Sequence, residues 1–388
     1  MVGMSPVRRT LAVAVAALLP TFALVAAGQQ APERARATYA RALELESKGE
    51  QGAALALLWE AAALAPRDAD IQNRLGKALE RIGALDAAIA AYRSAISERA
   101  DFREASNNLI LALAKAGQGA EAVERARALV RVAPDDPERL FTLGLALSEV
   151  DVEDAIVTFR RVLSLAPKHV LARYNLALVL KRTDRLGEAL NELERILAIE
   201  PRPEAYYTRG MIYSHQGDLD RAAMALGDAV AASPNFAEAH AALGSVLKAR
   251  RDWPGAAAAL RRAIGLTPDD PAPHFTLAQV QRSAGDERGA AAELARASLL
   301  RQRQQSDQEA RMWTAAGTQK LYRGDLAGAL DLFRRASAVN GGYAPAHYQM
   351  GRALQALGRA EEAQQAFARA AALNPSLATP RAPESPQR

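Results

Sequence analysis

The sequence repeats itself at a nearly constant interval of 33 or 34 residues. One position in each unit holds a small residue, Ile110 being the single exception, and the interval lengthens to 39 residues only before Gly317. An interval this regular predicts an array of small units that stack on one another, each too small to bury its own apolar face. The marked positions are Ala42, Gly76, Ile110, Gly144, Ala177, Gly210, Gly244, Ala278, Gly317 and Gly351.

Each unit is predicted to contain two helices. In the segment Leu140-x-x-Leu143-Gly144-x-x-Leu147, apolar or small residues recur at i, i+3, i+4 and i+7, which places them on one helical face. A glycine or an aspartate such as Asp184 then indicates a short turn, and a proline closes most units because it lacks the N–H that a helix needs. A small residue at the marked position lets two helices approach closely, while a large neighbour fills the groove between them.

These units resemble the tetratricopeptide repeat family. Its pattern matches Trp313-x2-Ala316-Gly317 followed by Ala329-x3-Phe333, and again Met350-Gly351-x2-Leu354 followed by Ala363-x3-Phe367 and Pro375. The resemblance extends from about Ala35 to Pro375. It implies an all-α, right-handed superhelical solenoid of about ten helix–turn–helix repeats, in an exported bacterial member of the family.

The pattern divides the chain into six parts. Residues 1–27 form a signal peptide, 28–34 a short lead, 35–302 repeats one to eight, 303–309 a polar connector, 310–375 repeats nine and ten, and 376–388 a disordered proline-rich tail. The connector lies within the polar segment Arg301–Arg311, which is read either as a hinge or as an extended helix.

The N-terminal segment has the features of a secretory signal peptide. Arg8 and Arg9 precede the apolar run Leu11–Ala27, which ends in small residues. We expect cleavage after Ala27 and a periplasmic or secreted protein. The alternative is an inner-membrane anchor formed by residues 11–27, because this run is close to the shortest length that spans a bilayer.

The sequence offers no recognisable reaction centre or cofactor site. The chain has no cysteine, which excludes disulfides, thiolate metal sites and a cysteine nucleophile. His240, His274 and His347 each occupy the position of the family's tryptophan, so we interpret them as packing residues. No phosphate-binding or dinucleotide-binding glycine motif is present. We therefore predict a chain that is not an enzyme and needs no cofactor or metal.

Charge gives no indication of nucleic-acid binding. The formal net charge of +5 falls to +3 when Arg8 and Arg9 are removed with the signal, and no dense basic stripe accompanies it. Acidic residues do recur in the first turn of the first helices, at Asp70, Glu104, Glu138, Glu204 and Glu238. They indicate either an acidic groove or an ordinary favourable interaction with the helix dipoles, and we favour the dipole interpretation.

A partly aromatic series lies three residues before the marked positions, on a face that lines the inner, concave surface in the family's solenoid. It is either a set of anchors for a partner polypeptide or packing between neighbouring first helices. A second series lies four residues after the first, on the same helical face. Residues of the two series together form the candidate partner groove: Tyr39, Asn73, Lys77, Asn107, Phe141, Tyr174, Tyr207, Met211, Phe275, Tyr348 and Arg352.

The function predicted from the sequence is that of a non-catalytic scaffold or adaptor. It would bind a protein or peptide partner in its concave groove, in cell-envelope assembly or export by analogy of fold. The alternatives are a carbohydrate- or polymer-binding module, or an accessory subunit of an envelope enzyme complex. Partner identity, pathway and oligomeric state are not specified by the sequence.

Overall fold

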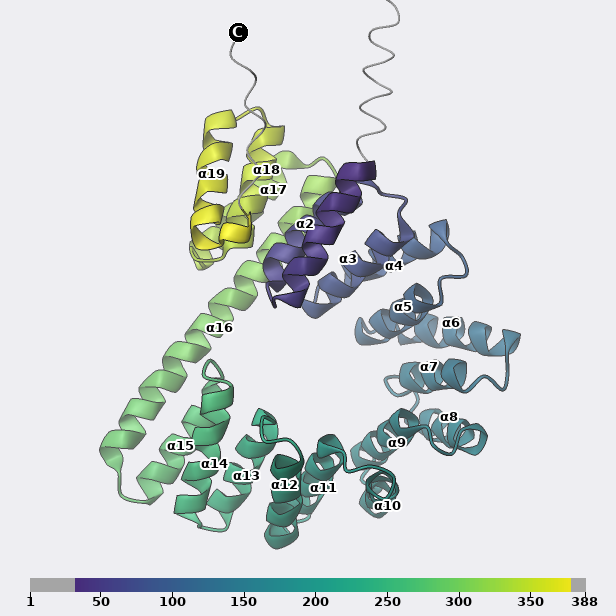
Figure 1. The fold of residues 1–388 in the computed structure, drawn as a ribbon, viewed down its shortest axis with the longest axis vertical. Coiled ribbons are helices and arrows are strands. Elements are labelled where there is room, and N and C mark those ends of the chain that lie inside the picture. The colour runs from purple at the N-terminus through teal and green to yellow at the C-terminus, as the bar shows by residue number, and fades with distance from the viewer. Residues whose placement is uncertain (1–31, 378–388) are drawn as a thin grey trace, which may run out of the picture. The chain divides into compact units, whose positions relative to one another are not determined.

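The computed structural model describes residues 32–377, and this part of the chain is built from helices without a strand (Figure 1). The predicted signal peptide and almost all of the predicted tail lie outside the described residues. The chain divides into two compact units. Within the described residues, unit 1 comprises 32–112 with 307–377, and unit 2 comprises 113–306.

Both units are stacks of antiparallel helix pairs of the predicted length, so the all-α repeat fold is confirmed. Unit 1 contains a helix at residues 32–47, α2 (Gln51–Leu64), α3 (Ala69–Arg81), α4 (Leu85–Glu98), most of α5 (Arg103–Lys115), α17 (Leu326–Val339), α18 (Ala344–Ala356), α19 (Ala360–Leu373) and the 3-10 turn η1 (Pro375–Leu377). Unit 2 contains α6 (Gly119–Val132), α7 (Pro137–Leu147), α8 (Val152–Leu165), α9 (Val170–Arg182), α10 (Leu186–Leu197), α11 (Pro203–His215), α12 (Leu219–Ala232), α13 (Ala237–Ala249), α14 (Trp253–Leu266) and α15 (Pro271–Ser283).

The polar segment predicted as a hinge or an extended helix is an extended helix. A single helix, α16 (Glu287–Tyr322), joins the second helix of repeat eight to the first helix of repeat nine (Figure 1). The reason is local: residues 290–316 contain neither glycine nor proline and are rich in alanine, arginine, glutamine and leucine. The boundary between the units falls inside this helix, after Ser306, and a second boundary follows Ala112, where the sequence shows no break.

Close packing of the two helices in each pair depends on the marked small residues. A β-carbon built on Gly144 would lie 2.6 Å from the Phe159 ring, and one built on Gly76 would lie 2.5 Å from the Tyr92 ring. Both rings are completely buried. The large residue of the second helix therefore occupies the space that the glycine leaves free.

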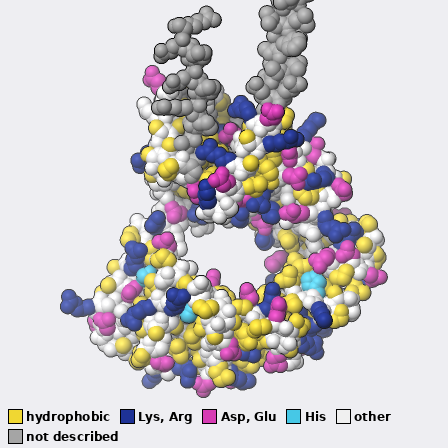
Figure 2. Space-filling model, viewed as in Figure 1, with side chains coloured by type: hydrophobic (Ala, Val, Ile, Leu, Met, Phe, Trp, Pro, Cys, Tyr) yellow, Lys and Arg dark blue, Asp and Glu magenta, His cyan; other side chains and the backbone are white. Residues whose placement is uncertain are grey.

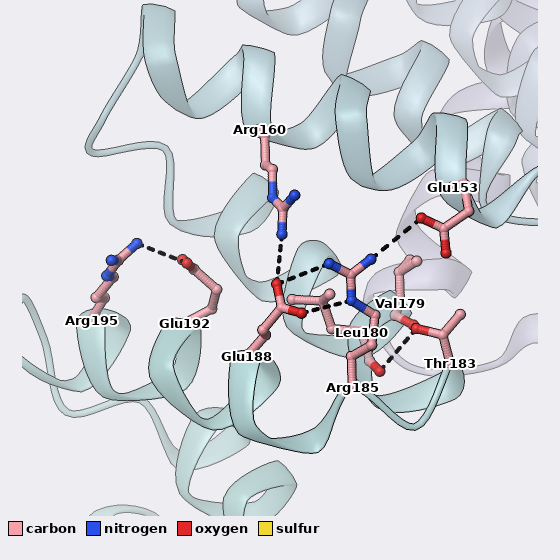
Figure 3. Close-up of polar contacts among 9 residues, drawn as sticks. All are labelled: Glu153, Arg160, Val179, Leu180, Thr183, Arg185, Glu188, Glu192 and Arg195. Atoms are coloured by element: carbon pink, nitrogen blue, oxygen red, sulfur yellow. Dashed lines mark hydrogen bonds and ion pairs between the residues drawn. The ribbon is translucent and has the colours of Figure 1, made fainter.

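Charged side chains on the surface of unit 2 link neighbouring repeats. Glu188 accepts hydrogen bonds from Arg160 at 2.6 Å and from Arg185 on two oxygens, and Arg185 also reaches Glu153 (Figure 3). These contacts link α8 to α10. Because solvent reaches these side chains, it screens the pairs, and each contributes little to stability.

In unit 1 the first repeat packs against the last repeats. Helix α2 is apolar on nearly all sides, and eight of its residues are buried, so it needs cover on more than one face. Helix α18 packs against α2, where the Tyr348 hydroxyl donates a hydrogen bond to Glu60 at 3.0 Å. Asn374, at the end of α19, donates to Glu50, the residue before α2, at 3.2 Å. A β-carbon on Gly52 would lie 2.9 Å from the Pro345 ring.

Replacing Gly144 by alanine should destabilise unit 2 despite the better helix propensity of alanine. Overpacking against the buried Phe159 ring costs about 1–3 kcal/mol, which exceeds the propensity gain of up to about 1 kcal/mol. Gly227→Ala, on α12 with no atom within 4 Å of the added carbon, should instead stabilise by about 0.5–1 kcal/mol. Urea unfolding measures the change in the free energy of unfolding for each variant. A Gly144→Ala variant more stable than the wild type would contradict the packing account.

Replacing Gly52 by leucine should loosen the contact between the first and last repeats. The added side chain must displace Pro345, so amide hydrogen exchange in α18 and α19 should accelerate, while exchange in α7 to α15 should not change. Gly187→Leu is the matched control, because Gly187 is also the second residue of its helix and has open space around it. Unchanged protection of α18 in Gly52→Leu would show that α2 does not hold the last repeats.

Candidate binding groove

The predicted groove residues are distributed over both units. Unit 1 holds Tyr39 on the first helix, Asn73 and Lys77 on α3, Asn107 on α5, and Tyr348 and Arg352 on α18. Unit 2 holds Phe141 on α7, Tyr174 on α9, Tyr207 and Met211 on α11, and Phe275 on α15.

In unit 1, several of these residues join neighbouring repeats. Asn73 and Tyr348 are each only 5% exposed. Asn73 accepts a hydrogen bond from Asn108 at 3.0 Å, and Lys77 forms an ion pair with Glu104 at 3.0 Å. Asn73 and Tyr348 are therefore buried contacts between helices, which is the packing alternative for this series, because their polar ends are satisfied inside the stack.

In unit 2, most of the aromatic series also packs between adjacent repeats. The Tyr174 hydroxyl is 3.0 Å from the Thr208 hydroxyl, and the Phe141 ring lies 4.9 Å from the His169 ring. Tyr207 packs against Phe236 with ring centroids 5.3 Å apart. Of the five predicted residues in this unit only Phe275 is largely open, at 43% exposed.

A groove opens where the aromatic series is interrupted. Repeat seven carries Ala241 at the position that holds Tyr207 and Phe275 in the repeats on either side. The space next to Ala241 is a groove of about 400 Å³ over α13, which we call the α13 groove. This volume falls in the range of about 300–1,000 Å³ that is typical of ligand pockets.

Three helices line the α13 groove. Tyr207, Met211 and Ser214 come from α11; Ala241, Ala242, Ser245 and Ala249 from α13; and Pro273 and Thr276 from α15. In the space-filling view, hydrophobic side chains lie between charged ones over α11 to α13 (Figure 2). The sequence prediction included Tyr207 and Met211 but missed the residues of α13. The available signal was side-chain size, because Ala241 and Ser245 are the smallest pair of residues at these two positions in any repeat.

The acidic residues in the first turns of the first helices differ in their partners, and Glu204 has no ion-pair partner among the described residues. Asp70 pairs with Arg99 at 2.6 Å, Glu104 with Lys77, and Glu138 approaches His169 at 3.3 Å. Glu238 lines the groove, is exposed and has no ion-pair partner among the described residues.

The groove also contains a second carboxylate and a perturbed tyrosine. Asp270 caps α15 by accepting a hydrogen bond from the Ala272 N–H at 2.9 Å. Burial, followed by the nearby charge of Glu238, raises the pKa of Tyr207 above its ordinary value. None of the lining residues is lysine, arginine or histidine.

The histidines at the tryptophan position hold local structure. His240 and His347 each lie 3.1 Å from the carbonyl oxygen six residues earlier, and His274 is 2.6 Å from Glu293. Over residues 32–377, no group of three or more histidine, aspartate or glutamate side chains is arranged to hold a metal ion. None of the helices in that range has a stretch long and apolar enough to span a bilayer.

Family models described as tetratricopeptide repeat match residues 69–102, 146–212, 207–271 and 320–381. Each matched range includes a complete helix pair, namely α3 with α4, α9 with α10, α13 with α14, and α18 with α19. The chain belongs to the tetratricopeptide repeat family. Its candidate site is thus a groove on the first helices of a tetratricopeptide repeat unit.

Solved structures of similar proteins share little sequence with this chain. A tetratricopeptide repeat protein from Parabacteroides merdae is 20% identical, with a TM-score of 0.48, over 64% of this chain and 99% of that one. A thermophilic tetratricopeptide repeat protein from Thermus thermophilus is 23% identical, with a TM-score of 0.41, over 46% and 98%. Yeast Tom70 is 13% identical, with a TM-score of 0.38, over 88% and 92%. No curated protein matches the sequence.

Proposed function

We propose that this tetratricopeptide repeat protein is a non-catalytic scaffold that binds a segment of a partner polypeptide on the first-helix face of unit 2. The observation that carries the proposal is the α13 groove. Small side chains on α13 leave a space of about 400 Å³ between α11 and α15 that no described residue fills. Uncovered apolar surface of this kind is typical of a docking site.

The packing of the aromatic rings favours a polypeptide over a carbohydrate. Binding to a sugar face needs an open aromatic ring. The Phe141 and Tyr207 rings are engaged with His169 and Phe236, and the one open ring of the series in unit 2, Phe275, does not line the groove. The groove instead offers a narrow space between helices with a few hydroxyl groups from Ser214, Ser245 and Thr276. Such a space suits one bulky side chain of an extended or helical segment.

Filling the groove should abolish binding without disturbing the fold. Ala241→Tyr places in repeat seven the ring that Tyr174 and Tyr207 carry in repeats five and six, so the helix pair can accommodate it. Peptides selected from a random display library on the wild-type protein should bind Ala241→Tyr at least about tenfold more weakly by fluorescence anisotropy, because a single anchor dominates such interfaces.

Ala258→Tyr is the matched control for this experiment. Ala258 lies on α14, is exposed and does not line the groove, so the same substitution there should leave affinity unchanged. Equal binding of the selected peptides by wild type and Ala241→Tyr would refute the proposed function.

We also propose that the protein is exported. Support comes from the sequence of residues 1–27 alone, where two arginines, an apolar run and small residues follow one another. N-terminal sequencing of the protein recovered from the cell envelope should give Gly28 as the first residue. Recovery of the intact N-terminus in the membrane fraction would instead support the anchor.

A further inference from the structure

We propose that the α13 groove selects a segment in which a bulky apolar side chain lies close to a lysine or an arginine. The inference rests on the proposed function, because it requires unit 2 to bind a polypeptide. It goes further by assigning the chemistry of that polypeptide from the lining of one groove.

The apolar requirement follows from what repeat seven lacks. In repeat five, Tyr174 occupies the equivalent position and forms a hydrogen bond to the next first helix. At Ala241 no ring is present, and the methyl groups of Ala241 and Ala242 face the space together with Met211. A large apolar side chain of another chain would regain the dispersion contacts that the missing ring does not make.

The cationic requirement follows from charge complementarity. Glu238 and Asp270 both line the groove, from α13 and from the turn before α15, and neither forms an ion pair within the described residues. In the same acidic series, Asp70 pairs with Arg99 and Glu104 with Lys77, whereas Glu204, like Glu238, has no ion-pair partner among the described residues. Glu238 is distinguished by lying in the groove together with a second carboxylate, Asp270. At the groove the chain supplies none, so a cation from the partner meets uncompensated negative charge.

Helix dipoles explain part of this arrangement but leave the charge available. An acid in the first turn is favoured by the positive end of its helix, and Asp270 uses one oxygen, Oδ1, as a cap. These contacts lower the energy of the carboxylates without neutralising them. A partner with glutamate or aspartate at the same place would therefore be repelled, which gives the groove selectivity by sign of charge.

Peptide selection separates this inference from the function on which it rests. A random display library selected on the wild-type protein should give peptides enriched in a bulky apolar residue with lysine or arginine within a few positions. Enrichment of apolar residues alone would overturn the cationic part and leave the proposed function standing. Failure to select any peptide that Ala241→Tyr excludes would overturn both.

Charge-neutral variants then test the two carboxylates. Glu238→Gln and Asp270→Asn remove charge with little change in shape, and asparagine keeps the helix cap. With one selected lysine peptide, each variant should bind about threefold to fivefold more weakly and the double variant about tenfold more weakly. A norleucine version of the peptide should bind wild type and double variant equally.

Glu204→Gln is the matched control, because Glu204 has the same first-turn position on α11 and lies outside the groove. It should leave the affinity for the lysine peptide unchanged. The preference of the wild type for lysine over norleucine should also shrink as salt is raised, since the pairs form at an accessible rim. An undiminished preference for lysine in the double variant would overturn the inference.

Discussion

The structure depends on the close approach of two helices at one small residue in each repeat. Where that residue is glycine, a large side chain from the second helix fills the space, as Phe333 does at Gly317 and Phe367 does at Gly351. The interval between these contacts sets the length of the repeat, and the stacking of repeats then orients all first helices in a unit in the same way. The groove exists because this orientation aligns equivalent positions of successive first helices.

In the third repeat, the combined size of the small residue and its packing partner is kept although their order is reversed. At the positions that hold a small and a large residue elsewhere, it has Ile110 and Ala126, so the sizes are reversed. Both residues are almost completely buried. The bulky residue at the marked position of the first helix is thus matched by a small residue at the facing position of the second helix, as a close-packed interior requires.

Much of the fold could be predicted from the sequence because its determinants are local and repeated. The period, the turn residues and the packing pairs each recur, and Asp184 adopts the left-handed backbone (φ 58°) that glycine provides in other turns. Three repeats lack a closing proline, at Ala100, Gln302 and Gly341, and the sequence did not show how the second helix of each one ends. At Ala100 the chain still turns, with Arg99 over the Phe102 ring at 3.7 Å, whereas at Gln302 the helix continues through α16.

The candidate site could be predicted only in part, because its position depends on contacts between repeats. The sequence located the face and two of the lining residues, Tyr207 and Met211, but it could not distinguish aromatic residues that pack between first helices from those beside open space. That distinction depends on partners such as Thr208 and Phe236, which lie in neighbouring elements. The packing of α2 on α18 was likewise not predicted, since it joins residues 288 positions apart.

Photo-crosslinking from the floor of the groove tests the central claim most directly. The chain has no cysteine, so Ala241→Cys can carry a single benzophenone label, with Ala258→Cys as the label on the other side of the repeat. The account predicts that peptides selected on the wild-type protein cross-link to position 241 and not to position 258. Equal cross-linking at both positions, or cross-linking at 258 alone, would contradict it.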